Sequence, residues 1–240
     1  MNIDIIIFTA HPDDAEISIG GTIAKLAKHN RTVGIIDLTK GELGTRGSAE
    51  TREMEAESAS KILGIAIRDN LNIPDGKVKP SQEYIEKVIV QIRKYKPQII
   101  FAPYFNDRHP DHIGAGQIVK EAMFLSGLPK IVTTENGTVQ DSYRPKKLFY
   151  FMMTYEFEPT FIVDISNTLT TKIDAIKAFK TQFYDPNSNA PETFISKPDF
   201  IRNIEARAKF YGFQIRKEFG EPFYSEEKIE MNFDWMLDGM

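Results

Sequence analysis

Apolar positions along the chain follow two alternating patterns. Short continuous runs rich in β-branched residues are typical of strands buried on both faces, and they predict strands at residues 3–9, 32–38, 98–102, 148–153 and 161–165, with a weaker one at 70–73. Segments in which apolar residues recur every three or four positions predict helices from residue 13 to about 30, then at 48–63, 81–95, 111–126, about 169–183 and 200–211. Strands that alternate with helices predict one α/β domain over residues 1–240, with a Rossmann-like, mostly parallel sheet and helices on both faces.

The first predicted helix contains two glycines in its interior. Gly20 and Gly21 occupy positions where glycine costs about 1 kcal/mol relative to alanine. Two explanations are open. Either the helix approaches the sheet closely at this point, or it is kinked there.

Polar residues cluster directly after two of the predicted strands. His11-Pro12-Asp13-Asp14 follows the first strand, His109-Pro110-Asp111-His112 follows the strand at 98–102, and together they hold three of the four histidines of the chain. Ligands of open parallel sheets bind beyond the carboxyl ends of the strands. We therefore expect the two clusters to meet at this edge, although helix capping and packed loop histidines explain each cluster when it is taken alone.

The side chains of His11, Asp14 and His112 suit a mononuclear metal site. Two imidazoles and one carboxylate leave a coordination position for water, which is typical of catalytic rather than structural zinc. Zinc lowers the pKa of its bound water to about 7, so the pattern predicts a hydrolase. Asp13 is adjacent to a ligand but should point differently from it, which suits a general base. The alternative is that Asp13 only interacts favourably with the helix dipole.

His109 precedes His112 by three residues, so it can face the same cavity without binding the metal. As an imidazolium, it would stabilise an oxyanion, and Asp111 would hold its ring and raise its pKa. Capping of the following helix is the alternative role for Asp111.

A glycine-rich loop at residues 41–47 follows the second predicted strand. It leads into the N-terminus of the helix at 48–63, which is a natural anion site. Arg52, near the first turn of that helix, and Arg46 are therefore candidates to bind a substrate carboxylate or a sugar hydroxyl. An ion pair between Arg52 and Glu55 is the alternative.

Composition narrows the class of protein and its compartment. A net charge of −4 gives no reason to expect nucleic-acid binding, so we expect a small-molecule partner. Because the chain has no cysteine, histidine and carboxylate ligands must hold any zinc. The first apolar run lacks a basic preceding region, and no segment approaches the roughly 18 apolar residues of a membrane helix. We expect a cytoplasmic protein with no membrane segment.

These motifs resemble those of a known family. Residues 10–16, Ala-His-Pro-Asp-Asp-Ala-Glu, and the cluster at 109–112 are similar to the PIG-L or LmbE-like deacetylases, zinc enzymes that remove acetyl groups from N-acetylglucosamine derivatives. Residues 40–47, followed by Glu50 and Arg52, and residues 220–224 resemble the bacterial branch that deacetylates N-acetylglucosaminyl malate during bacillithiol biosynthesis.

The resemblance implies zinc on His11, Asp14 and His112, with Asp13 as the general base and His109 as oxyanion stabiliser or acid. Iron(II) is the alternative to zinc.

The resemblance also implies that Arg52 binds substrate, and the two carboxylates of a malate group would give this arginine a target. It further implies a homo-oligomer, commonly a hexamer, although the tail at residues 233–237 can equally dock on its own subunit.

Three alternative functions stay open. A non-haem iron(II) oxygenase also uses two histidines and one carboxylate, which His11, Asp13 and a distant histidine would supply, although such sites usually lie on all-β folds. A metal- or sugar-binding module without catalysis would leave Asp13 and His109 without a role. A deacetylase could also act on another N-acetylglucosaminide, such as a chitooligosaccharide or a glucosaminyl phosphatidylinositol.

Overall fold

The computed structural model describes residues 2–230. Its main strands are β1 (Ile5–Thr9), β2 (Val33–Asp37), β3 (Ile67–Asn70), β4 (Ile99–Pro103), β7 (Lys147–Phe151), β8 (Phe161–Asp164) and β9 (Gly220–Tyr224), and a small hairpin contains β5 (Thr134–Glu135) and β6 (Thr138–Val139). Its helices are α1 (Asp14–Lys28), α2 (Ala49–Leu63), α3 (Gln82–Tyr95), α4 (Pro110–Ser126), α5 (Leu169–Ala178) and α6 (Phe200–Gln214).

Seven strands form one sheet in the order β3-β2-β1-β4-β7-β9-β8. The strands from β3 to β7 run parallel to one another, whereas β9 is antiparallel to both of its neighbours. From β1, the chain adds β2 and β3 on one side, and it then places β4 on the other side of β1. The strand order therefore reverses between β1 and β4, as in Rossmann-like folds. The predicted α/β class and mostly parallel sheet are confirmed.

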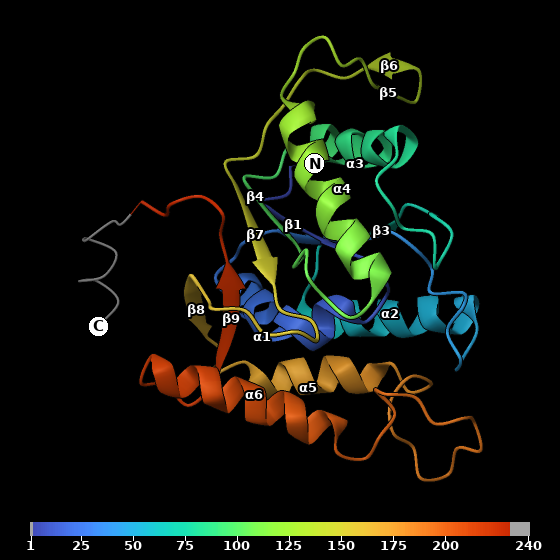
Figure 1. The fold of residues 1–240 in the computed structure, drawn as a ribbon, viewed down its shortest axis with the longest axis vertical. Helices are drawn as coiled ribbons and strands as arrows, with labels where there is room; N and C mark the ends of the chain where they lie inside the picture. Colours follow the sequence, from blue (N-terminus) through green and yellow to red (C-terminus); the bar gives the residue numbers. More distant parts are fainter. Residues whose placement is uncertain (1, 231–240) are drawn as a thin grey trace.

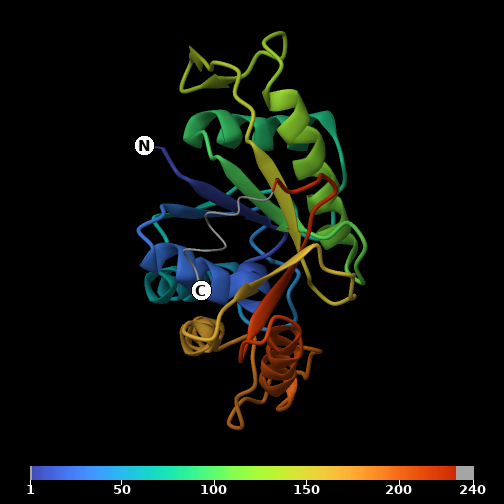
Figure 2. The same ribbon diagram turned by 90° about the vertical axis from the view of Figure 1, so that its left-hand side faces the viewer.

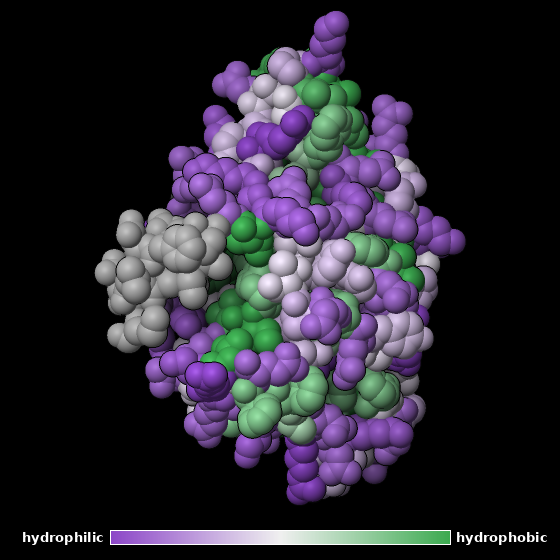
Figure 3. Space-filling model, turned by 60° about the vertical axis from the view of Figure 1, so that its left-hand side comes forward, coloured by the Kyte–Doolittle hydropathy of each residue, from purple (hydrophilic) through white to green (hydrophobic). Residues whose placement is uncertain are grey.

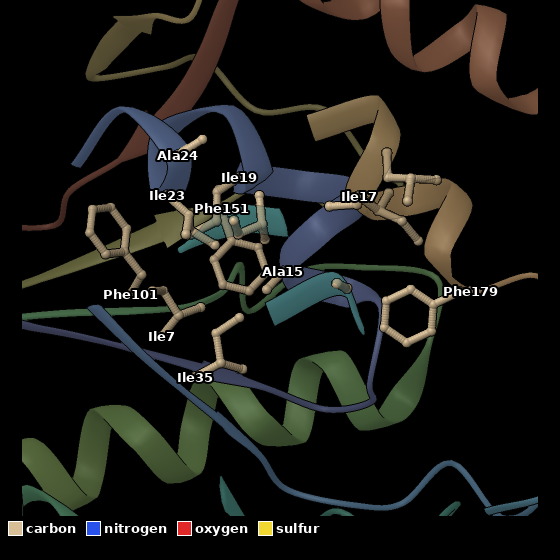
Figure 4. Packing of buried hydrophobic residues seen from close by; sticks show 14 of the residues in the cluster. Ile7, Ala15, Ile17, Ile19, Ile23, Ala24, Ile35, Phe101, Phe151 and Phe179 are labelled. Atoms are coloured by element: carbon tan, nitrogen blue, oxygen red, sulfur yellow. The ribbon is translucent and has the colours of Figure 1, made fainter. Parts of the chain in front are cut away.

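Helices cover both faces of the sheet (Figures 1 and 2). On one face, α3 and α4 pack over a core that includes Ile6, Phe8 and Ile100. On the other face, α1 and α2 cover a second core that includes Ile7 and Phe101 (Figure 4). α5 packs against α1 and α2 as a further layer, and α6 packs against β9. Alternate residues of β1 therefore enter opposite cores, which explains why its whole sequence is apolar.

The boundaries of two predicted elements differ from the structure. The weak strand expected at 70–73 begins three residues earlier, at Ile67, and the left-handed backbone of Asn72 (φ 52°) ends regular pairing beyond it. Leu71 and Ile73 are nevertheless buried, which accounts for their apolar pattern. The helix expected at about 169–183 ends at Ala178.

The strand β9 is absent from the predicted elements. Pro222 lies at its centre, and proline argues against a strand because it has no N–H for a ladder hydrogen bond. Even so, β9 lies inside the sheet, where Pro222 is in register with Ile162 of β8.

Both explanations offered for the two glycines in α1 hold in part. The helix is broken at Ile19 (φ −130°, ψ 19°). A Cβ atom at Gly21 would lie 2.8 Å from the Ile165 side chain, and one at Gly20 would lie 3.1 Å from Cγ of Lys172. The close approach is thus to α5 and the residues before it, not to the sheet as expected.

Most of the face shown in Figure 3 is hydrophilic, with apolar patches between the polar side chains. Among the described residues, no helix combines the length and the apolar composition needed to cross a membrane. The tail at residues 233–237, which we considered for docking, lies outside the described residues.

Candidate active site

The two histidine clusters meet at the carboxyl edge of the sheet, because β1 and β4 are parallel neighbours. One ligand atom from each of His11, Asp14 and His112 lies within 4.8 Å of the others, and all three residues are buried. Oδ1 of Asp14 lies 3.3 Å from Nε2 of His112, and Oδ2 of Asp14 lies 3.6 Å from Nδ1 of His11. These facing donor atoms, two imidazole nitrogens and a carboxylate, fit a divalent metal ion with an open coordination position.

The turn after β1 is held by one of these ligands. Oδ2 of Asp14 accepts hydrogen bonds from the backbone N–H groups of Ala10 (3.1 Å) and His11 (2.9 Å). The same side chain therefore closes the turn and directs its second oxygen at His112.

A second group of possible ligands shares His11. It contains His11, His109 and Asp111, again with ligand atoms within 4.8 Å of one another. Both oxygens of Asp111 accept backbone N–H groups, from Gly76 at 2.7 Å and from Val78 at 3.2 Å. Because Asp111 already has these partners, His11, Asp14 and His112 are the group better placed to hold a metal ion, and Oδ2 of Asp111 lies 3.4 Å from Nε2 of His11.

Two aspartates that were not predicted as site residues contact the two histidines that could bind a metal ion. Oδ1 of Asp75 lies 3.0 Å from Nε2 of His11, and Oδ1 of Asp107 lies 2.9 Å from Nδ1 of His112. Carboxylates in this position fix the ring orientation and raise the basicity of a metal-binding histidine. Asp75 sits in a Pro-Asp-Gly turn and Asp107 two residues before His109, so each carries only a turn signal in the sequence.

The pKa values of these partners show how strongly they interact. Burial disfavours the charged forms, but hydrogen bonds from His112 and from backbone N–H groups still lower the pKa of Asp107 to about 2. Burial also lowers the pKa of His112, yet Asp14 and Asp107 raise it to about 9 overall. A metal ion would bind the neutral imidazole, so its binding at His112 would release a proton wherever the ring is charged.

Asp13 has the properties of a proton acceptor. Its backbone has a positive φ of 109°, which few residues other than glycine adopt, and its side chain is buried. Burial raises the pKa of Asp13 to about 7, although the charge of Arg52 opposes the rise. A general base with a pKa near the working pH is well matched to its task.

His109 differs from the imidazolium that the sequence suggests. Its Nδ1 accepts a hydrogen bond from the backbone N–H of Asp111 (3.2 Å), so the neutral ring carries its proton on Nε2. Burial and the charges of His11 and His112 lower the pKa of His109. The charge of Asp111 raises the pKa of His109, as expected, but by less than burial and the two neighbouring histidines lower it. The Asp111 carboxylate instead accepts backbone N–H groups of Gly76 and Val78.

The two arginines that were predicted to bind substrate also have partners within the protein, and Arg52 lines the cavity over the site. The buried Arg52 donates to the carbonyl oxygens of Gly41 (2.9 Å) and Pro12 (2.6 Å), and its Nη2 lies 3.2 Å from Oδ2 of Asp13. Arg52 thus contacts the Asp13 carboxylate, and its binding of substrate stays a prediction. Arg46 donates to Oγ of Ser188 (2.8 Å).

A cavity of about 800 Å³ opens over these groups, which is within the range of small-molecule sites. His11, Asp13, His109 and His112 line its polar floor, and its other walls come largely from the segment before α6 and from α6 itself. The sequence reading missed these walls. The lining residues that were not predicted include Arg108 and Met153, from two other loops, together with Phe194, Ile195, Phe200, Ile204, Arg207 and Phe210.

Two buried histidines and an aspartate that could hold a metal ion lie beside a second buried aspartate, a combination that suits hydrolysis. Comparison with known proteins specifies the class. Residues 6–123 match the family model PIG-L, described as GlcNAc-PI de-N-acetylase. Over 185 residues, the chain is 30% identical to a diacetylchitobiose deacetylase of Thermococcus kodakarensis, covering 72% of this chain and 67% of that protein.

Two solved structures agree with this match. The conserved protein TT1542 from Thermus thermophilus is 32% identical, with a TM-score of 0.85 and coverage of 96% of this chain and 97% of that one. The N,N'-diacetylchitobiose deacetylase from Pyrococcus horikoshii is 27% identical, with a TM-score of 0.78 and coverage of 92% and 82%. The chain belongs to the PIG-L family, and it is an N-deacetylase. The oxygenase and the non-catalytic binding module are thereby set aside.

Proposed function

We propose that this enzyme hydrolyses the N-acetyl group of an N-acetylglucosamine derivative. The observation that carries the proposal is the position of Asp13, a buried carboxylate with a pKa of about 7, next to the grouped His11, Asp14 and His112. In our proposal these three residues hold zinc, with iron(II) as the alternative. Zinc supplies a Lewis acid to such a site and lowers the pKa of water.

Asp13 carries out the proton transfers of the reaction, and His109 stabilises the developing charge. Asp13 accepts a proton from the attacking water while the new bond forms between oxygen and the acetyl carbon. His109 lines the cavity and donates a hydrogen bond from Nε2 to the oxyanion as charge develops there. When the carbon–nitrogen bond breaks, the proton held by Asp13 goes to the departing amine, so the products are acetate and a free glucosamine.

The group attached to the sugar has two candidates. N-acetylglucosaminyl malate, the bacillithiol precursor, follows from the motif resemblance at residues 40–47 and 220–224. A chitooligosaccharide is favoured by the two relatives named as diacetylchitobiose deacetylases and by the aromatic wall at Phe194 and Phe210. Arg52 lines the cavity, but it donates to Gly41 and Asp13, and Arg46 donates to Ser188, so only part of each guanidinium is left for a dicarboxylate.

An acetate-release assay tests the proposed function. It compares N-acetylglucosamine, its malate glycoside and diacetylchitobiose, with zinc and iron measured on the same enzyme sample. We expect acetate from at least one of these substrates, and the ratio of their kcat/KM values identifies the attached group. No acetate from any substrate with a metal-loaded enzyme would contradict the proposal. The expected cytoplasmic location and homo-oligomer stay predictions.

Replacing Arg52 with methionine tests its role beside Asp13. Loss of the neighbouring positive charge raises the pKa of Asp13, so the acid limb of the kcat/KM profile should move to higher pH by about 1 unit or more. Arg46→Met is the control, because Arg46 bonds to Ser188 instead and should leave the limb in place. A raised KM for the malate glycoside with an unmoved acid limb would instead support the substrate-binding role that we first expected.

A further inference from the structure

The break in α1 lies a little more than one turn after the metal ligand Asp14. In an unbroken helix, the N–H of Thr22 would donate to the carbonyl of Ser18. In the structure, Ile19 leaves helical geometry, and Thr22 N–H and Ser18 O each have another partner. The helix is therefore two short pieces, and the piece that carries Asp14 ends at Ser18.

A buried ion pair contacts the backbone on both sides of the break in α1. Glu221 of β9 accepts the backbone N–H groups of Gly21 (3.0 Å) and Thr22 (2.7 Å) and the Thr22 hydroxyl (2.6 Å). Nζ of Lys172, from α5, donates to the Ser18 carbonyl (3.1 Å) and lies 2.6 Å from Oε1 of Glu221. The carboxylate thus caps the start of the second piece, and the ammonium caps the end of the first.

The contacts of Lys172 and Glu221 with α1 depend on the kink at Ile19 and on the glycine that follows it. The side chains of Lys172 and Glu221 are each only 2% exposed, so neither charge has water as an alternative partner. A methyl group at Gly20 would press on the stem of Lys172, where a Cβ atom would lie 3.1 Å from Cγ. Neither Lys172 nor Glu221 lines the large cavity, so neither touches the substrate.

We propose that Lys172 and Glu221 are positioning residues that fix the Asp14-bearing piece of α1 for metal binding. A piece of five residues is too short to be a stable helix without external contacts. Its carboxyl end is held by Lys172, and at its other end Asp14 closes the turn that carries His11 and Asp13. His112 belongs to α4 and contacts Asp107, so it would not follow a movement of this piece. Such a movement would therefore shift Asp14 away from His112.

The proposal rests on the metal site of the proposed function, but its test does not depend on the substrate. Zinc is titrated into the metal-free full chain, against a competing chelator, well below the unfolding temperature of each variant. Glu221→Gln should weaken zinc binding by about 10- to 100-fold, the range found for groups that orient metal ligands. In either orientation, the amide NH2 faces a donor, which is the Lys172 ammonium or the Thr22 N–H. Lys172→Met with Glu221→Gln also removes the donor to the Ser18 carbonyl, so the double variant should bind zinc no more tightly than Glu221→Gln.

Arg93→Met is the matched control for general destabilisation. Arg93 is buried on α3, on the opposite face of the sheet, and donates to the carbonyls of Ser126 and Ile131 among others. This variant should lower the unfolding midpoint but keep wild-type zinc affinity.

The milder variants Gly20→Ala and Thr22→Val keep the test decisive if Glu221→Gln does not fold. They disturb the stem of Lys172 and one hydrogen bond of Glu221, respectively, and each should weaken zinc binding by a smaller factor. Wild-type zinc affinity in folded Glu221→Gln would overturn the proposal. Wild-type affinity in both milder variants would do the same if Glu221→Gln is unfolded.

Discussion

Asparagine in place of Asp13 is expected to lower kcat/KM by about 10²- to 10⁴-fold, the usual cost of losing a positioned base. Asparagine keeps the size of the side chain, and it tolerates a positive φ better than most residues, so the backbone at 109° should persist. Because His11, Asp14 and His112 are unchanged, the variant should still bind one metal ion. The assay is steady-state acetate release with metal analysis of the same preparation.

The control for this substitution is Asp174→Asn, at an exposed position of α5. It should behave as wild type in both measurements. An Asp13→Asn enzyme with full activity would remove Asp13 from the mechanism. An inactive enzyme that has also lost its metal would show that Asp13 supports the site rather than the reaction.

Alanine in place of Asp14 should abolish stoichiometric zinc binding and reduce activity at least as far as Asp13→Asn does. The substitution removes the oxygen that faces His112 and also the acceptor for the N–H groups of Ala10 and His11. Both the ligand and the turn that positions His11 are lost together. Metal content after dialysis, followed by activity in added zinc, measures the effect.

Asp107→Asn provides the comparison, because Asp107 contacts His112 without belonging to the ligand group. Loss of such an orienting carboxylate typically costs 10- to 100-fold in metal affinity or activity. Excess zinc should therefore restore Asp107→Asn but not Asp14→Ala. Stoichiometric zinc in dialysed Asp14→Ala would refute the assignment of this ligand.

The parts of the site that the sequence predicted share one property. His11, Asp14 and His112 lie directly after apolar strands, and parallel strands bring their carboxyl ends to the same edge of the sheet. Local pattern and fold class were therefore enough to place them together. The same rule brought Asp13 and His109 to the cavity.

The rest of the site depends on contacts that no local pattern encodes. Asp75 and Asp107 look like ordinary turn residues, and their function appears only when the loops meet the histidines. Arg52 was predicted to face the substrate because its position near a helix N-terminus is a common anion site. In the structure, the same guanidinium also donates to two buried carbonyl groups and contacts Asp13, which its position in the sequence does not indicate.

The sheet was predicted less completely at its last strands. β9 was not predicted because it contains Pro222. Nothing in the sequence around Glu221 indicates that its partners lie in α1 and α5. The break at Ile19 was one of two explanations for the adjacent glycines, because a pair of glycines permits a kink but does not require one.

The place of β9 in the sheet has a consequence for the order of folding. β9 is the last strand of the described chain, yet it lies between β7 and β8, which precede it by many residues. During synthesis from the N-terminus, β7 presents an unpaired edge until residues 220–224 have emerged from the ribosome. Pairing with β9 then protects this edge from self-association and delivers Glu221 to α1 in the same event. On our proposal for Glu221, a nascent chain would acquire its capacity to bind metal only after this strand has joined the sheet.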